Sequence, residues 1–227
     1  MPFNFAIFKT RALTAVLFAI IMLTGLLWNQ WSFIILFIII HFGCWYEFIK
    51  IIRKIHPNNY LYYLPTGLLY ISLPVLMMID LSHPYYNYDV IKKNVFPVIP
   101  CGIVLSIWIN DTMAYLVGSL IGKTPFSKIS PKKTWEGTIG GAISCIALMI
   151  VVGWVSRFYK LADWIAIALI CGVFGTLGDL LESKLKRMAA IKDSGSFMPG
   201  HGGFLDRFDS ILAATPLVWL YVYFFMQ

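Results

Sequence analysis

The chain has 227 residues, of which 59% are hydrophobic and 13% charged, and its formal net charge is +7. Soluble domains are about 45–50% apolar and about 25% charged, so this composition excludes a water-soluble globule, a disordered chain and a small disulfide scaffold. Because a membrane-spanning helix needs ~20 apolar residues, the length accommodates about seven spans. The sequence therefore predicts an all-α, polytopic integral membrane bundle with a polar site at its cytoplasmic face.

The predicted spans, in chain order, are residues 12–28, 31–49, 61–79, 95–109, 138–155, 161–181 and 208–225. We interpret the first as a retained helix rather than a secretory signal, because no small-residue cleavage site precedes the next apolar run. The apolar segment 110–121 either continues the fourth span or forms a separate short helix. Residues 1–107 carry no motif, so we place the catalytic region in residues 108–227.

Basic residues are distributed unevenly between the two sides of the predicted bundle. With the N-terminus inside, 14 of the 18 Lys and Arg lie in inner segments and 4 in outer loops, in agreement with the positive-inside rule. This predicts a multi-pass protein of a bacterial inner (cytoplasmic) membrane, with its site facing the cytoplasm. Since the excess is a topology signal and no basic stripe is interleaved with aromatics, no nucleic-acid partner is expected. The four cysteines show no metal-site spacing and are predicted to be free thiols.

Acidic residues gather where the last two spans meet the inner face. Asp179 lies at the tail of one apolar run, and Asp206 and Asp209, three residues apart, share one helix face at the head of the next. Like charges on one face repel unless a cation or a proton lies between them, and oxygen ligands suit Mg²⁺, Mn²⁺ or Ca²⁺. We predict that some of these three aspartates bind a divalent metal. The alternative is simple neutralisation by the neighbouring basic residues, which are Lys186, Arg187 and Arg207.

Between these acids, residues 192–203 form a glycine-rich segment flanked by basic side chains. Glycines let the backbone approach a ligand closely, and successive N–H groups can cradle phosphate. Together with the acids, the segment predicts a polyphosphate–metal site. His201, held between glycines, either contacts phosphate, relays a proton or serves as a structural donor.

Two further clusters lie upstream. Lys132 and Lys133, in the segment 130–137, are either ordinary topology determinants or phosphate-binding groups. Asp111 lies against an apolar span, where it either caps a helix or belongs to the polar site. Neither pattern decides between its alternatives.

These segments resemble the signature of the phosphatidate cytidylyltransferase family, also called CDP-diacylglycerol synthase. The resemblance covers roughly residues 108–209 and includes Asn110-Asp111-Thr112, Ser130-Pro131-Lys132-Lys133-Thr134-Trp135-Glu136-Gly137, Gly178-Asp179, Ser183-Lys184-Leu185-Lys186-Arg187, Lys192-Asp193 and Pro199-Gly200-His201-Gly202-Gly203-Phe204-Leu205-Asp206-Arg207-Phe208-Asp209. Met198 stands where the family usually has Leu, Ile or Phe, a volume-conserving exchange. The N-terminal half is also shorter than in that family.

The resemblance implies an enzyme that transfers the CMP moiety of CTP to phosphatidic acid, giving CDP-diacylglycerol and pyrophosphate. It also implies a homodimer in the lipid bilayer that requires Mg²⁺, with room for a second, monovalent cation. The expected catalytic residues are Asp179, Asp206, Asp209, Lys192 and His201, the three aspartates being the metal ligands. The expected substrate-binding residues are Asp111, Lys132, Lys133, Ser183, Lys186, Arg187, Gly202, Gly203 and Arg207. The alternatives are a CTP-dependent lipid kinase acting on a polyprenol or phytol, and a cation-coupled transporter.

Overall fold

The computed structural model describes residues 5–83, 97–198 and 202–226, with side chains from residue 12 onward. In these ranges all regular structure is helical, apart from two isolated bridges. Six helical segments are long and apolar enough to cross a membrane: α2 (Gln30–Ile55), the run Tyr60–Leu81, α7 (Val98–Ile121), α8 (Trp135–Ser156), α9 (Leu161–Met188) and α10 (Leu205–Phe225). The prediction of a polytopic helical membrane protein is therefore confirmed. The first predicted span lies in α1 (Phe5–Leu27), whose stretch Ala12–Leu27 is apolar but shorter than the other six.

Several helix boundaries differ from the predicted ones. Segment 110–121 continues the fourth span, because α7 is unbroken through it. Helix α9 continues beyond the predicted end at residue 181 to Met188, so the basic cluster there is helical rather than part of a loop. A long side chain can leave an apolar helix surface and place its charge in water, which explains why the helix does not stop where its charges begin.

The third span is a composite of α3 (Tyr60–Tyr63), α4 (Pro65–Gly67), the π-helix η1 (Leu68–Ser72) and α5 (Leu73–Leu81). Pro65 and Pro74 each lie at the start of one of these pieces. Proline has no N–H to donate to the preceding turn. The hydrogen-bond register therefore changes along this span while the chain stays helical.

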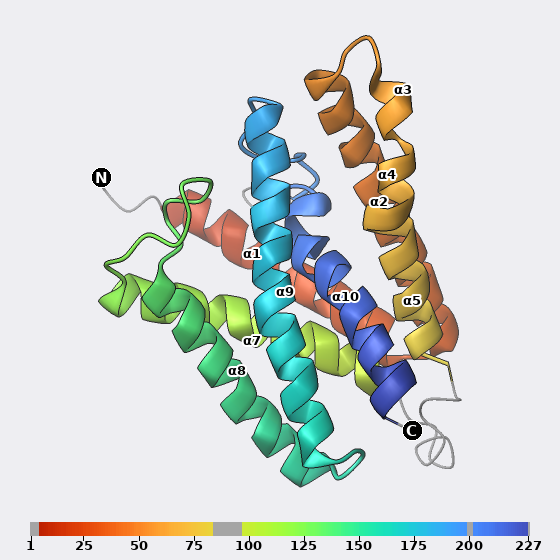
Figure 1. The fold of residues 1–227 in the computed structure, drawn as a ribbon, viewed down its shortest axis with the longest axis vertical. Coiled ribbons are helices and arrows are strands. Elements are labelled where there is room, and N and C mark those ends of the chain that lie inside the picture. The colour runs from red at the N-terminus through yellow and green to blue at the C-terminus, as the bar shows by residue number, and fades with distance from the viewer. Residues whose placement is uncertain (1–4, 84–96, 199–201, 227) are drawn as a thin grey trace.

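Helix α9 lies at the centre of the bundle, between α8 and α10 (Figure 1). Glycines bring the neighbouring helices close: an added Cβ at Gly141 of α8 would lie 2.6 Å from the backbone oxygen of Asn110 in α7. Small residues allow this close backbone approach between helices in membranes. One buried apolar cluster includes residues of α1, α2, α5, α7, α9 and α10, so both halves of the chain share a core.

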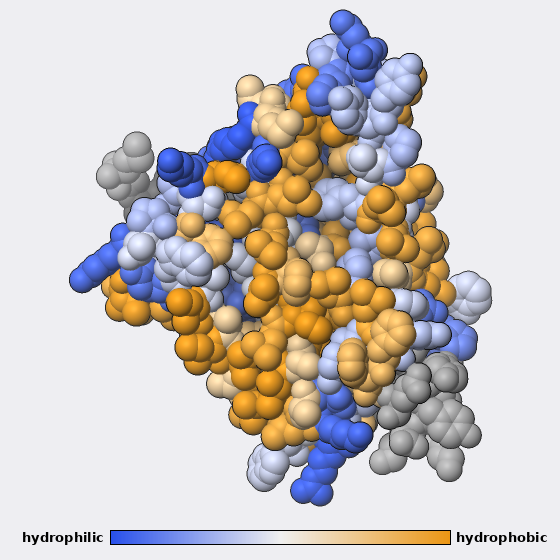
Figure 2. Space-filling view, in the orientation of Figure 1, coloured by the Kyte–Doolittle hydropathy of each residue, from blue (hydrophilic) through white to orange (hydrophobic). Residues whose placement is uncertain are grey.

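The outer surface is apolar over much of α8, α9 and α10, whereas polar side chains gather toward the ends of the bundle (Figure 2). Exposed residues such as Leu169, Val173 and Leu177 of α9 contribute to this apolar surface. A helix that buries apolar residues inward and exposes others outward suits a lipid environment. The C-terminal part of α9 and the N-terminal part of α10, which carry the predicted site, lie beside each other (Figure 1).

Candidate active site

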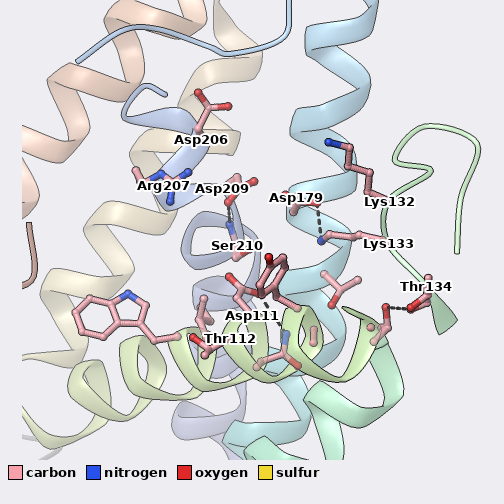
Figure 3. Close-up of a pocket in the computed structure, with 18 of the residues that line it drawn as sticks. Asp111, Thr112, Lys132, Lys133, Thr134, Asp179, Asp206, Arg207, Asp209 and Ser210 are labelled. Atoms are coloured by element: carbon pink, nitrogen blue, oxygen red, sulfur yellow. Dashed lines mark hydrogen bonds and ion pairs between the residues drawn. The ribbon is translucent and has the colours of Figure 1, made fainter. Parts of the chain in front are cut away.

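A cavity of about 630 Å³ lies among α7, α8, α9, α10 and the 122–134 loop (Figure 3). This volume is within the ~300–1,000 Å³ range of small-molecule sites. Its charged lining consists of four aspartates and three basic residues, namely Asp111, Asp179, Asp206, Asp209, Lys132, Lys133 and Arg207. All three aspartates predicted to bind metal therefore face one cavity.

Asp179 and Asp209 face the same cavity, and α9 and α10 approach closely beside them. An added Cβ at Gly178 would lie 2.6 Å from the backbone oxygen of Asp209 and 2.6 Å from the Cβ of Ala213. Only glycine leaves room for this contact. Asp209 is buried, and its Oδ1 accepts the backbone N–H of Ser210 at 2.6 Å. The residue before Asp179 thus sets the spacing between two carboxylates that the sequence separates by 30 positions.

The 122–134 loop carries the two predicted lysines to the cavity. Lys133 Nζ lies 2.6 Å from Asp179 Oδ2, and both side chains are 31% exposed. The loop is fastened at its ends, because Glu136 accepts the backbone N–H and the hydroxyl of Thr124, and Thr134 caps the first turn of α8. Lys132 lines the same cavity. The lysine pair therefore contributes positive charge to this site.

Asp111 lies inside α7 and lines the cavity. The alternative that it caps a helix is therefore wrong: α7 begins at Val98, and residue 111 falls well within the helix. A carboxylate in the interior of a spanning helix is costly to bury and tends to mark a functional site.

Asp206 differs from the other two predicted metal ligands in its partners. Its Oδ1 lies 2.5 Å from Lys186 Nζ, and its Oδ2 accepts the backbone N–H and hydroxyl of Ser194 and the backbone N–H of Gly203, each at 2.8 Å. Lys186 also pairs with the fully buried Glu182. A carboxylate offers about four acceptor positions, so a cation at Asp206 has to displace one of these four donors.

Three glycines of the 192–203 segment pack against the protein's own carboxylates. An added Cβ at Gly202, whose φ is +85°, would lie 2.5 Å from Asp206 Oδ2. At Gly195 and Gly203 it would overlap the carboxylate of Glu47. Packing against these carboxylates therefore requires glycine at all three positions, whether or not a ligand binds there. Contact of Gly202 and Gly203 with substrate phosphate stays a prediction.

Other predicted residues lie elsewhere. Among the described residues, the predicted ones that do not line the cavity are Ser183, Lys186, Arg187, Lys192, Gly202 and Gly203. Lys186 reaches the site through Asp206. His201 lies outside the described residues, so its role stays a prediction.

The cavity also contains polar residues to which the sequence analysis gave no role. They are Asn110, Thr112, Tyr115, Ser119, Thr134, Thr138, Thr176 and Ser210. Spacing could have found some of them, because Thr176 is three residues before Asp179 and Tyr115 four after Asp111, and such pairs share a helix face. Glu47 had no identifiable partner in the sequence; in the structure it accepts hydrogen bonds from the start of α10.

The acidic groups suit a hard divalent cation that is completed by ligand oxygens. In the part of the chain that the structure describes, no three His, Cys, Asp or Glu side chains form a ready metal cluster. Mg²⁺, however, is usually bound by one or two carboxylates together with waters and substrate phosphates. Asp179 and Asp209 supply oxygen donors of this kind on one cavity wall. The donor set therefore fits magnesium bound together with a polyphosphate.

Comparison with known proteins gives a consistent result. A family model described as "Cytidylyltransferase family" matches residues 89–225. "Phosphatidate cytidylyltransferase 4, chloroplastic" of Arabidopsis thaliana is 45% identical over 114 residues, which cover 50% of this chain and 29% of that protein. "Phosphatidate cytidylyltransferase" of Staphylococcus saprophyticus is 45% identical over 117 residues (50% and 45%), and that of Synechocystis is 42% identical over 117 residues (51% and 40%). The matched part of the chain spans less than half the length of these relatives.

Proposed function

Because the chain belongs to the cytidylyltransferase family, we propose that it transfers the CMP moiety of CTP to phosphatidic acid, forming CDP-diacylglycerol and pyrophosphate. The relatives named phosphatidate cytidylyltransferase support this choice of substrates. The observation that carries the proposal is the single cavity in which Asp179 and Asp209 face Lys133 at a polar end of the bundle.

The location of the cavity suits two substrates of opposite solubility. CTP enters from water, whereas the acyl chains of phosphatidic acid stay in the bilayer. A cavity lined by the first turns of α8 and α10 and by interior residues of α7 and α9, beside the 122–134 loop, serves both. We place this end at the cytoplasmic face, because most of the chain's Lys and Arg lie in segments on that side.

The basic side chains address the main obstacle, which is the approach of two anions. The phosphate of phosphatidic acid is ionised at neutral pH, so its attack on the α-phosphate of CTP needs no strong base. Lys132, Lys133 and Arg207 line the cavity and neutralise phosphate oxygens, Arg207 with a fork suited to two of them. They thereby hold the nucleotide and the lipid headgroup within reach of each other.

Asp179 and Asp209 would hold Mg²⁺, with Asp206 as the third ligand predicted from the sequence. When bound, the ion offsets charge on the triphosphate and the departing pyrophosphate. Before the ion binds, Lys133 keeps the Asp179 carboxylate directed into the cavity through their ion pair. A second, monovalent cation and assembly as a homodimer in a bacterial inner membrane complete the proposal.

The test is turnover with labelled nucleotide. Purified protein with phosphatidic acid and Mg²⁺ is expected to transfer label from the α-phosphate of CTP into lipid and none from the γ-phosphate. Transfer of γ-label would identify a lipid kinase, and cation flux in proteoliposomes without nucleotide turnover would identify a transporter. Either result refutes the proposal.

A variant pair localises the activity. Asp209→Asn keeps the side-chain volume but removes a charge from the cavity, and we expect at least a roughly hundredfold loss of turnover, comparable to the loss of other strong transition-state contacts. Asp163→Asn is the control, because Asp163 is buried at the opposite end of α9 and bonds Tyr221 at 2.9 Å. Near-normal turnover of the Asp209 variant removes this residue from the site.

A further inference from the structure

Glu47, in α2, is a buried acidic residue that the proposed chemistry does not use. Its side chain is 3% exposed, and it lies outside residues 89–225 that match the family. Its Oε1 accepts the backbone N–H of Phe204 at 3.0 Å, and its Oε2 accepts that of Leu205 at 2.9 Å and the Ser194 hydroxyl at 2.7 Å. All three donors belong to α10 or to the segment before it.

The first turn of α10 depends on this carboxylate. Among the described residues, α10 receives no side-chain hydrogen bond from its own N-cap residue, Phe204. The first N–H groups of a helix have no partner within the helix, and a negative charge there also interacts favourably with the helix dipole. Glu47 therefore caps α10 from a different helix.

Ser194 connects this cap to the wall of the cavity. Its hydroxyl lies 2.7 Å from Glu47 Oε2 and 2.8 Å from Asp206 Oδ2, so one proton is shared between two carboxylates. Gly195 and Gly203 leave the space that the Glu47 carboxylate occupies, since an added Cβ at either would overlap it. Residues 194–195 and residues 203–205 thus all pack against or bond the Glu47 carboxylate.

We propose that Glu47 is a positioning residue: by fixing the first turn of α10, it sets the direction in which Arg207 and Asp209 enter the cavity. Both residues lie within the first five positions of α10 and line the cavity. A displacement of about 1 Å in a reacting group can cost ~100-fold in rate. A residue of the second helix thereby contributes to the geometry of a site whose charged lining comes from positions 111–209.

Glu47→Gln tests this directly, because it keeps the shape but turns one acceptor oxygen into a donor that faces an N–H group. Hydrogen exchange is measured on the peptide covering the first turn of α10, and we expect it to quicken about tenfold, as for loss of a charge-assisted hydrogen bond. The kinetic readout, which rests on the proposed function, is expected to show kcat lowered at least about tenfold with KM for CTP changed less than about threefold.

Asp163→Asn is again the matched control, since it too neutralises a buried carboxylate in a spanning helix. Its exchange in α10's first turn and its kcat are expected to match the wild type. If Glu47→Gln also leaves both quantities at wild-type values, the proposal is overturned. The same holds if the two variants lower kcat equally through a common loss of thermal stability.

Ser194→Ala covers the case in which Glu47→Gln does not fold. This variant removes the hydroxyl that donates to Glu47 and Asp206 and that accepts the backbone N–H of Asp206 at 3.3 Å in the first turn of α10, and it leaves the backbone bond from Ser194 to Asp206. We expect faster exchange in the same peptide, by a smaller factor, and unchanged exchange refutes the positioning role. The exchange measurement needs no substrate, so it decides the role of Glu47 even if the wild-type protein forms no CDP-diacylglycerol and the proposed function fails.

Discussion

Gly178→Ala perturbs the site without changing any group that touches a ligand. The new Cβ would lie 2.6 Å from both the Asp209 backbone oxygen and the Ala213 Cβ, whereas ordinary contact begins at 3.4 Å. Helices α9 and α10 therefore have to separate locally by about 0.8 Å, the difference between these two distances. The backbone oxygen cannot rotate away as a flexible side chain would, so Asp179 and Asp209 move apart.

The expected effect on stability is small and the effect on rate is large. Overpacking costs about 1–3 kcal/mol, and the better helix propensity of alanine returns up to about 1 kcal/mol. The altered distance between the two carboxylates is expected to lower kcat about a hundredfold, as for a misplacement of ~1 Å. CDP-diacylglycerol formation and the thermal unfolding midpoint in detergent measure the two effects separately.

Gly175→Ala is the matched control, because Gly175 faces the same neighbour one turn earlier in α9. Its added Cβ would meet Ser210 Cβ at 3.5 Å, which is ordinary contact. This variant is expected to keep wild-type turnover. If Gly178→Ala is as active as Gly175→Ala, the close approach of the helices does not control the site.

Replacing Lys133 is expected to lower activity, whereas replacing Lys186 is expected to lower stability. Lys133→Met removes an ion pair whose members are both 31% exposed, so the free energy of unfolding should fall by about 1 kcal/mol or less. The steady-state rate with CTP should fall roughly a hundredfold, and a rate near wild type contradicts its role in phosphate binding. Lys186→Met leaves Glu182 and Asp206, 0% and 7% exposed, without their shared cation. The loss should reach about 3–5 kcal/mol, and an unchanged unfolding midpoint in detergent would show that the pair is not structural.

The spans and much of the charged lining were predictable because each has a local signal. Apolar runs of membrane length identify helices, and the spacing of Asp206 and Asp209 indicates one helix face. The charged end of α9 misled the prediction, since Lys186 and Arg187 resemble a loop in composition although the helix continues through them.

The sequence left the role of Lys186 open and named no partner for Glu47. Lys186 was either a phosphate-binding group or a neutralising partner of the aspartates, and the structure shows the second, with Lys186 between Glu182 and Asp206. Glu47 bonds backbone N–H groups more than 150 positions away, and a backbone N–H has no signature in the sequence. Long-range capping of this kind requires coordinates.

The ion pairs of Lys133 and Lys186 bear on the order in which the protein folds and binds metal. Each acidic centre already contains an ammonium group supplied by the chain itself. The polypeptide can therefore be synthesised, inserted and held in shape before a divalent ion arrives. Under the proposed function, loading of the ion would exchange one positive partner for another, so the supply of metal would govern activity without governing folding.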